Sequence, residues 1–146
     1  MGWGASLIFQ FGIGDRAVSD NQPNETIAGL RILIVEDEIM VAMLLEDMLT
    51  DLGCKVVMAG RVTSAVELIA TTPIDCAILD VNVAGEAVYP VAHELKGRHI
   101  PFVFSSGYGA GSLAAEYRDW PILSKPFQEK ELAPILLAAT RDRIRH

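Results

Sequence analysis

Residues 31–38 read Arg-Ile-Leu-Ile-Val-Glu-Asp-Glu, and this stretch decides the fold. Its apolar part is short, nearly continuous and β-branched, which predicts a strand that is buried on both faces. Three acidic residues follow directly, at the point where the strand should end. The stretch therefore predicts a core strand of an α/β sheet with carboxylates at its end.

Downstream of this strand, short apolar runs alternate with segments of helical periodicity. Further strands are predicted at 55–59, 75–79, 101–104 and 122–123, and helices at 38–52, 64–72, 87–96 and 128–141. Such alternation favours a parallel sheet with right-handed crossovers. We expect an α/β fold with a doubly wound five-stranded parallel sheet in the order 2-1-3-4-5, which is the flavodoxin-like arrangement.

Two local signals refine the predicted helices. Ser64 and Glu67 fit a capping box at the start of the second helix. Pro134 falls inside the last predicted helix, where the missing N–H should cost stability or bend the helix.

Composition and charge exclude several classes of protein. The net charge of −7 and the pI of about 4.8 argue against a nucleic-acid-binding surface. No apolar run approaches the roughly 20 residues that span a bilayer, so no membrane segment is expected. Cys54 and Cys76 lie in or beside apolar runs and are interpreted as buried thiols of a protein in a reducing cytoplasm.

The chain divides into two parts by composition. Residues 1–28 combine an aromatic, Gly-rich start with a polar stretch and are interpreted as an N-terminal extension or linker. That extension could pack on the domain or mediate self-association into a homodimer. Residues 29–146 are predicted to form the single folded domain.

Polar residues collect at the predicted strand ends. In a parallel sheet these ends share one rim, so Glu36, Asp37, Asp80, Ser106 and Lys125 should converge. Clustered carboxylates repel one another unless a cation joins them, and their hard oxygen ligands suit Mg²⁺. A lysine and a hydroxyl beside them can bind phosphoryl oxygens. This set of groups is what an aspartate needs to form an acyl phosphate.

Three of these strand-end motifs resemble those of response-regulator receiver domains, over about residues 30–142. The motifs are Ile34-Val35-Glu36-Asp37-Glu38, Ile78-Leu79-Asp80-Val81-Asn82 and Leu123-Ser124-Lys125-Pro126-Phe127. The resemblance implies a response regulator that accepts a phosphoryl group from a sensor histidine kinase with Mg²⁺ as cofactor. It does not imply an enzyme that turns over a separate substrate.

The resemblance also implies a role for each matching residue. Asp80 corresponds to the phosphoryl acceptor, and Glu36 and Asp37 correspond to acidic Mg²⁺ ligands. Asn82 matches the position whose backbone carbonyl binds the metal. Ser106 matches the hydroxyl that moves toward the phosphate. Lys125 matches the lysine that contacts the phosphoryl group, and its bond to Pro126 is expected to be cis.

The chain departs from the ordinary receiver pattern around the fourth strand. Residues 104–108, Phe-Ser-Ser-Gly-Tyr, resemble the Phe-Ala-Thr-Gly-Tyr strand of a stand-alone subgroup linked to HWE-type histidine kinases. The following segment is short and Gly-rich, so the fourth helix should be short or loose. Ile122 stands where many receivers have a rotating aromatic residue, and Tyr108 is a candidate to replace part of that relay.

Two readings of the function stay open. In the first, the chain is a phosphorylated single-domain regulator. In this reading no output domain is expected after residue 146, and the chain is expected to act by docking on a downstream protein or phosphotransfer protein, or as a phosphate sink. In the second, the same fold serves as a pseudo-receiver that signals by protein contacts without phosphate. The first reading is favoured because the chain keeps the acidic pair Glu36 and Asp37 together with Asp80, Ser106 and Lys125.

Overall fold

The computed structural model describes residues 26–145, and their side chains as far as Arg141. Most of the predicted N-terminal extension lies outside the described residues. Five parallel strands form the central sheet in the order β2-β1-β3-β6-β7. They are β1 (Arg31–Val35), β2 (Lys55–Ala59), β3 (Cys76–Asp80), β6 (Phe102–Ser106) and β7 (Ile122–Ser124). Numbered along the sheet's own strands, this order is the predicted 2-1-3-4-5.

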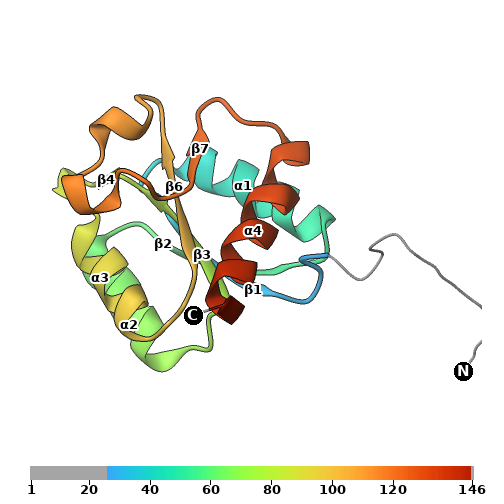
Figure 1. The fold of residues 1–146 in the computed structure, drawn as a ribbon. Helices are drawn as coiled ribbons and strands as arrows, with labels where there is room; N and C mark the ends of the chain where they lie inside the picture. The colour runs from blue at the N-terminus through green and yellow to red at the C-terminus, as the bar shows by residue number, and fades with distance from the viewer. Residues whose placement is uncertain (1–25, 146) are drawn as a thin grey trace, which may run out of the picture.

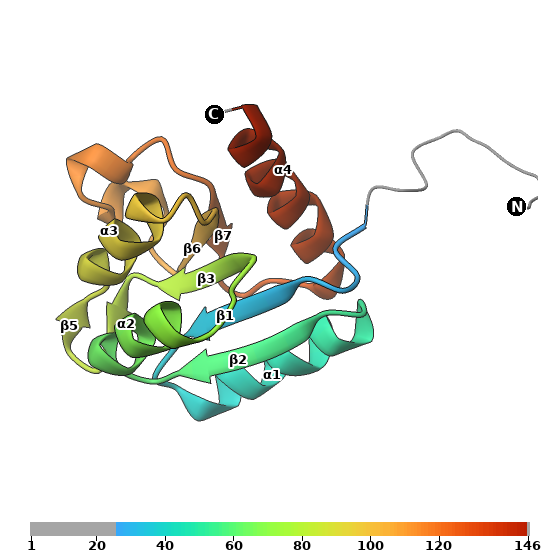
Figure 2. The same cartoon turned by 90° about the horizontal axis from the view of Figure 1, so that it is seen from below.

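Four helices cover the sheet in two pairs, one on each face (Figures 1 and 2). They are α1 (Ile39–Asp51), α2 (Val62–Thr71), α3 (Tyr89–Gly97) and α4 (Leu132–Arg145). Helices α1 and α4 pack on one face, and α2 and α3 pack on the other. The predicted doubly wound α/β fold is therefore confirmed.

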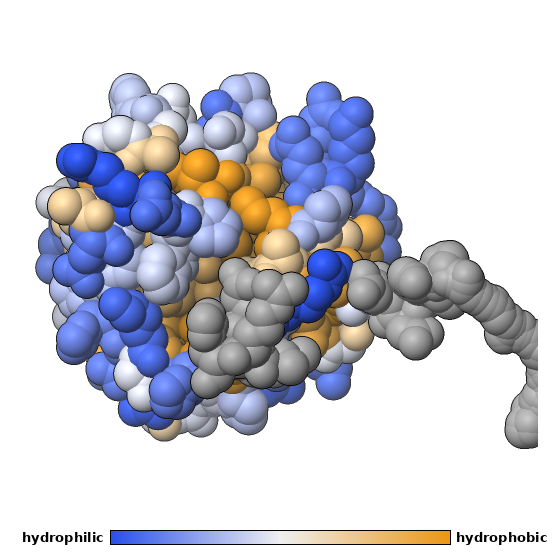
Figure 3. All heavy atoms as spheres, in the orientation of Figure 1, coloured by the Kyte–Doolittle hydropathy of each residue, from blue (hydrophilic) through white to orange (hydrophobic). Residues whose placement is uncertain are grey.

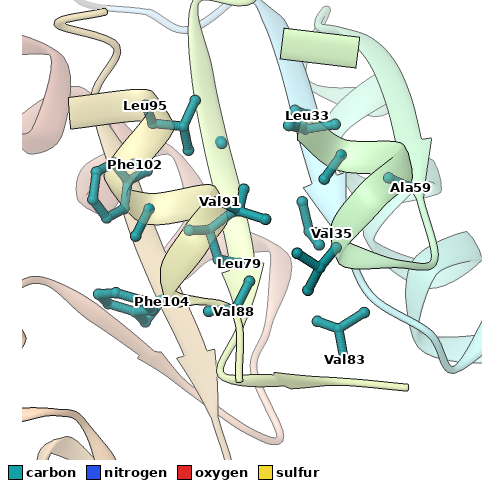
Figure 4. Packing of buried hydrophobic residues seen from close by; sticks show 14 of the residues in the cluster. Leu33, Val35, Ala59, Leu79, Val83, Val88, Val91, Leu95, Phe102 and Phe104 are labelled. Carbon is teal, nitrogen blue, oxygen red and sulfur yellow. The ribbon is translucent and has the colours of Figure 1, made fainter. Parts of the chain in front are cut away.

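The core consists of two apolar layers separated by the sheet. Figure 4 shows the layer beneath α2 and α3, where Leu79 and Phe104 of the sheet meet Val91 of α3. The other layer joins residues such as Ile34 to α1 and α4. Ile27, which lies just before the predicted start of the domain at residue 29, is 1% exposed and belongs to this second layer. Because alternate side chains of the central strands enter opposite layers, these strands need apolar residues throughout.

Both cysteines are buried as predicted, and neither forms a disulfide. The Cys54 thiol donates a hydrogen bond to the carbonyl of Ile27 at 3.3 Å. Burial raises the pKa of this thiol above its ordinary value. Cys54 thus helps to fix the first described residues against the sheet.

One predicted detail of the helices is wrong, and a second residue lies at a different place in its helix than predicted. The second helix begins at Val62 with Arg61 as its N-cap, so Ser64 lies inside the helix and makes no capping box. The helix starts earlier because Val62, Ala65 and Ile69 all bury their side chains on one helical face. Pro134 lies in the first turn of α4, where an N–H has no helical partner and a proline costs little.

Two short features complete the fold, of which the first was not predicted. A two-stranded antiparallel hairpin, β4 (Asn82–Val83) and β5 (Glu86–Ala87), follows β3 directly. Its turn residues Ala84 and Gly85 both have positive φ, which suits a tight two-residue hairpin. The segment after β6 contains two 3₁₀ turns, Ala110–Ser112 and Ala115–Tyr117, in place of a regular helix. The expectation of a short or loose fourth helix is confirmed.

The surface of the molecule is uneven in polarity. In the view of Figure 1, apolar surface gathers near the middle of the face and polar side chains surround it (Figure 3). Within residues 26–145, no helix combines the length and the apolar character needed to cross a bilayer.

Candidate functional site

The site lies at the carboxyl ends of β1, β3 and β6, where the chain leaves the sheet. Glu36 follows β1, Asp80 ends β3 and Ser106 ends β6. The register of the parallel strands aligns these ends along one edge of the sheet, since Val35 pairs with Leu79 and Asp80 pairs with Ser105. The sheet itself therefore brings together residues that are far apart in the sequence.

Three carboxylates meet at this rim. Oxygen atoms of Glu36, Asp37 and Asp80 all lie within 4.8 Å of one another. Glu36 is buried, Asp80 is partly buried and Asp37 is exposed. Such a set of hard oxygen donors, open to solvent on one side, fits a partly hydrated Mg²⁺ ion.

Lys125 joins two of these carboxylates. Its Nζ donates to Oε1 of Glu36 at 3.1 Å and to Oδ2 of Asp80 at 3.4 Å. Its backbone N–H donates to the carbonyl of Ser106 at 2.9 Å, which fixes the start of the loop after β7 against β6. The Lys125–Pro126 peptide bond is cis, as predicted.

The electrostatics of the site reflect an excess of negative charge. Burial raises the pKa of the Glu36 carboxyl, although hydrogen bonds from the Glu38 N–H and from Lys125 oppose this effect. Burial lowers the pKa of Lys125, but hydrogen bonds and attraction from Glu36 and Asp80 outweigh it and raise the pKa overall. The carboxyl of Asp80 also repels the charged form of Glu36, although less than burial disfavours it, and an added cation would offset both effects.

The remaining predicted residues occupy the edges of the site. The backbone N–H of Asn82 points to Oδ1 of Asp80 at 3.5 Å, and the Asn82 side chain is exposed. Ser106 is 4% exposed, and its Oγ accepts a hydrogen bond from the backbone N–H of Tyr108 at 2.9 Å. The Tyr108 ring does not cover the site in this structure, because it is 88% exposed.

Two residues that support the loop after β6, Ser112 and Tyr89, were not among the predicted site residues. Ser112 Oγ lies 3.3 Å from Ser106 Oγ, and the Tyr89 hydroxyl accepts the backbone N–H of Ala114 at 2.7 Å. Tyr89 also stacks on Tyr117 with 5.5 Å between the ring centroids. Ser112 could have been noticed as the polar residue that interrupts the Gly-rich segment, whereas nothing in the sequence indicated the partner of Tyr89.

Comparison with known protein families identifies the family to which the chain belongs. Residues 32–136 match the response regulator receiver domain. The chain belongs to this family. The match covers the strands of the central sheet, apart from the first residue of β1, and all three strand ends that form the site.

Individual relatives agree with this assignment. The chain is 43% identical to SdrG from Sphingomonas melonis Fr1, with a TM-score of 0.69, and the match covers 77% of this chain and 97% of that one. It is 25% identical, with a TM-score of 0.65, to the receiver domain of sensor histidine kinase PA1611 from Pseudomonas aeruginosa PAO1. That match covers 78% of this chain and 99% of the other, whose structure has a magnesium ion coordinated in the active site cleft.

Longer relatives match a similar share of the chain. Nodulation protein W from Bradyrhizobium diazoefficiens is 33% identical over an alignment of 123 residues, and the match covers 78% of this chain. The transcriptional regulatory protein PdtaR from Mycobacterium tuberculosis is 34% identical over an alignment of 119 residues, and the match covers 77% of this chain. The chain spans 53% and 58% of the lengths of these two proteins.

Proposed function

We propose that this receiver domain accepts a phosphoryl group on the carboxylate of Asp80. The observation that supports this most is the position of Lys125, whose Nζ contacts both Asp80 and the buried Glu36. A lysine placed between an acceptor carboxylate and a metal-binding carboxylate can neutralise phosphoryl oxygens as they arrive. Partly buried carboxylates that outnumber their cationic partner are typical of a functional site.

The proposed reaction transfers the group in line. An oxygen of the Asp80 carboxylate attacks phosphorus while the bond from phosphorus to the nitrogen of a donor phosphohistidine breaks. The histidine nitrogen keeps the electron pair, and the product is an acyl phosphate. Lys125 and the Ser106 hydroxyl would each contact a phosphoryl oxygen, so positioning supplies most of the catalysis.

Glu36, Asp37 and Asp80 are the proposed side-chain ligands of Mg²⁺, and the backbone carbonyl of Asn82 is proposed to complete the set. Bound there, the ion would screen the charge of the carboxylates and the phosphoryl oxygens. The carboxylate cluster supports this assignment, and so does the magnesium ion in the similar PA1611 receiver domain. Asp37 is exposed and can change its rotamer at little cost as the ion enters.

A sensor histidine kinase is the proposed donor, and a downstream protein or phosphotransfer protein is the proposed recipient of the signal. The first half of α1 begins directly after the acidic residues and exposes large apolar side chains. Ile39 is 63% exposed and Met40 is 78% exposed. Exposed apolar side chains beside an active rim favour protein docking over a purely solvent-facing role. We propose that the donor contacts this part of α1.

The competing reading is a pseudo-receiver that binds proteins without phosphate. Beryllofluoride with Mg²⁺ separates the two, because it mimics a phosphoryl group on an aspartate. The similar protein SdrG has a solution structure in a BeF₃-activated conformation, and this chain is 42% identical to it in that match. That structure supports the choice of this probe. We expect the wild-type chain to bind BeF₃⁻ only when Mg²⁺ is present, and the Asp80→Asn variant not to bind it. Wild-type chain that does not respond to BeF₃⁻ and Mg²⁺ in NMR or calorimetry would favour the pseudo-receiver.

A further inference from the structure

The hydroxyl of Ser106 is already engaged in this structure. Ser112 Oγ donates to the carbonyl of Gly109 at 2.7 Å, and that carbonyl can only accept. A serine hydroxyl has one proton, so Ser112 has none left for its 3.3 Å contact with Ser106. Ser106 must therefore donate to Ser112, while Ser106 Oγ also accepts the N–H of Tyr108.

The Ser106 hydroxyl has one proton to donate, and the hydrogen bond to Ser112 uses the proton that a bond to a phosphoryl oxygen would require. We propose that Ser112 is a positioning residue that accepts the hydrogen bond of the Ser106 hydroxyl in the resting chain, and that a phosphoryl group on Asp80 must replace Ser112 as the acceptor of this bond. The proposal rests on the proposed function and adds a second hydroxyl to it. The contact between the two hydroxyls is long for O–H···O, whereas a bond to a charged phosphoryl oxygen is shorter and stronger. Exchange of one partner for the other is therefore favourable once the phosphoryl group is present.

The structure also limits how far the change can spread. Loss of the Ser106 contact frees the residues between Gly107 and Ser112, where Gly109 has a φ of 77°. The next residue, Leu113, is 2% exposed and belongs to the core. The N–H of Ala114 is held by the Tyr89 hydroxyl. The conformational change should therefore end at Leu113 and not extend to the second 3₁₀ turn, Ala115–Tyr117.

The effect of Ser112 should appear only through Ser106. In Ser112→Ala the buried Ser106 hydroxyl loses its resting acceptor, and binding of BeF₃⁻ with Mg²⁺ should become about three- to tenfold tighter. In a Ser106→Ala background the same substitution should leave the affinity unchanged. Ser112→Thr keeps the hydroxyl and should retain wild-type affinity, and Ser64→Ala on α2 is the control for a serine away from the loop.

Calorimetry of the wild-type chain, the Ser106→Ala and Ser112→Ala variants, their double variant, and the Ser112→Thr and Ser64→Ala controls tests the proposal. The Mg²⁺ affinity of each chain is measured separately. Amide exchange should also show faster exchange at residues 107–112 on addition of BeF₃⁻ and Mg²⁺, with residues 113–117 unchanged. Unchanged affinity in Ser112→Ala, or equal tightening in the Ser106→Ala background, would overturn the role of Ser112 and leave the proposed function standing. A wild-type chain that does not bind BeF₃⁻ at all would overturn the proposed function and this role with it.

Discussion

At the scale of single residues, one rim collects groups from four separate places in the chain. Glu36 and Asp80 differ from ordinary surface acids because the sheet ends force them together and Lys125 bridges them. The sequence was sufficient to predict these three as neighbours, since parallel strand ends share one edge. It could not predict the partners of Ser106, because those depend on how the Gly-rich loop folds back.

Asp37 provides a direct test of the metal site. Asp37→Asn removes a charge from the carboxylate cluster but leaves an exposed side chain of the same size. We expect Mg²⁺ affinity to fall at least about tenfold, as is usual when a metal shell is weakened. Intrinsic fluorescence or NMR titration measures the affinity, and Asp47→Asn on α1 is the matched control. Equal Mg²⁺ affinity in wild type and Asp37→Asn would remove Asp37 from the ligand set.

At the scale of elements, the strands of the sheet were easier to predict than the helix boundaries and loops around it. Strands such as β1 and β6 are buried on both faces, so their apolar runs indicate them directly. The start of α2 was misjudged because Ser64 and Glu67 satisfy a capping pattern, whereas burial of Val62 decides where the helix begins. A tertiary contact overrode a local signal there, and residue patterns alone do not contain that information.

The exposed start of α1 gives a prediction about docking. Met40→Glu adds a charge at a position that is 78% exposed, so the fold should be unaffected. If the kinase contacts this surface, burying the new charge should slow phosphotransfer from a candidate kinase at least about tenfold. Phosphorylation by a small-molecule donor should proceed at the wild-type rate. Ala70→Glu, an exposed position on α2 across the sheet, is the control. Equal loss of phosphotransfer in both variants would argue against a kinase surface on α1.

At the scale of the whole molecule, one apolar layer links the site to the shortened fourth helical region. Phe104 is fully buried two residues before Ser106 and contacts the rings of Tyr89, Phe102 and Tyr117 edge-on. Tyr117 itself is 2% exposed. The aromatic rings thus fill the space that a regular helix would otherwise cover, which explains how the segment stays packed with only 3₁₀ turns.

Stability should depend strongly on this aromatic layer. Phe104→Ala removes a fully buried ring and should lower the free energy of unfolding by about 3–5 kcal/mol. Tyr108→Ala removes a ring that is 88% exposed and should change it by less than about 0.5 kcal/mol. Urea denaturation followed by circular dichroism measures both. A small loss in Phe104→Ala would mean that the layer repacks and does not support β6.

The central claim is that Asp80 is the phosphoryl acceptor, and mapping the modified residue tests it most directly. The purified chain is incubated with Mg²⁺ and a phosphodonor, either a small molecule or a candidate kinase with ATP, and then analysed by mass spectrometry. We predict one hydroxylamine-sensitive phosphate on the peptide that contains Asp80, and none in Asp80→Asn, which should fold normally because the residue lies at the rim. A phosphate on another residue, or one that persists in Asp80→Asn, would contradict the account.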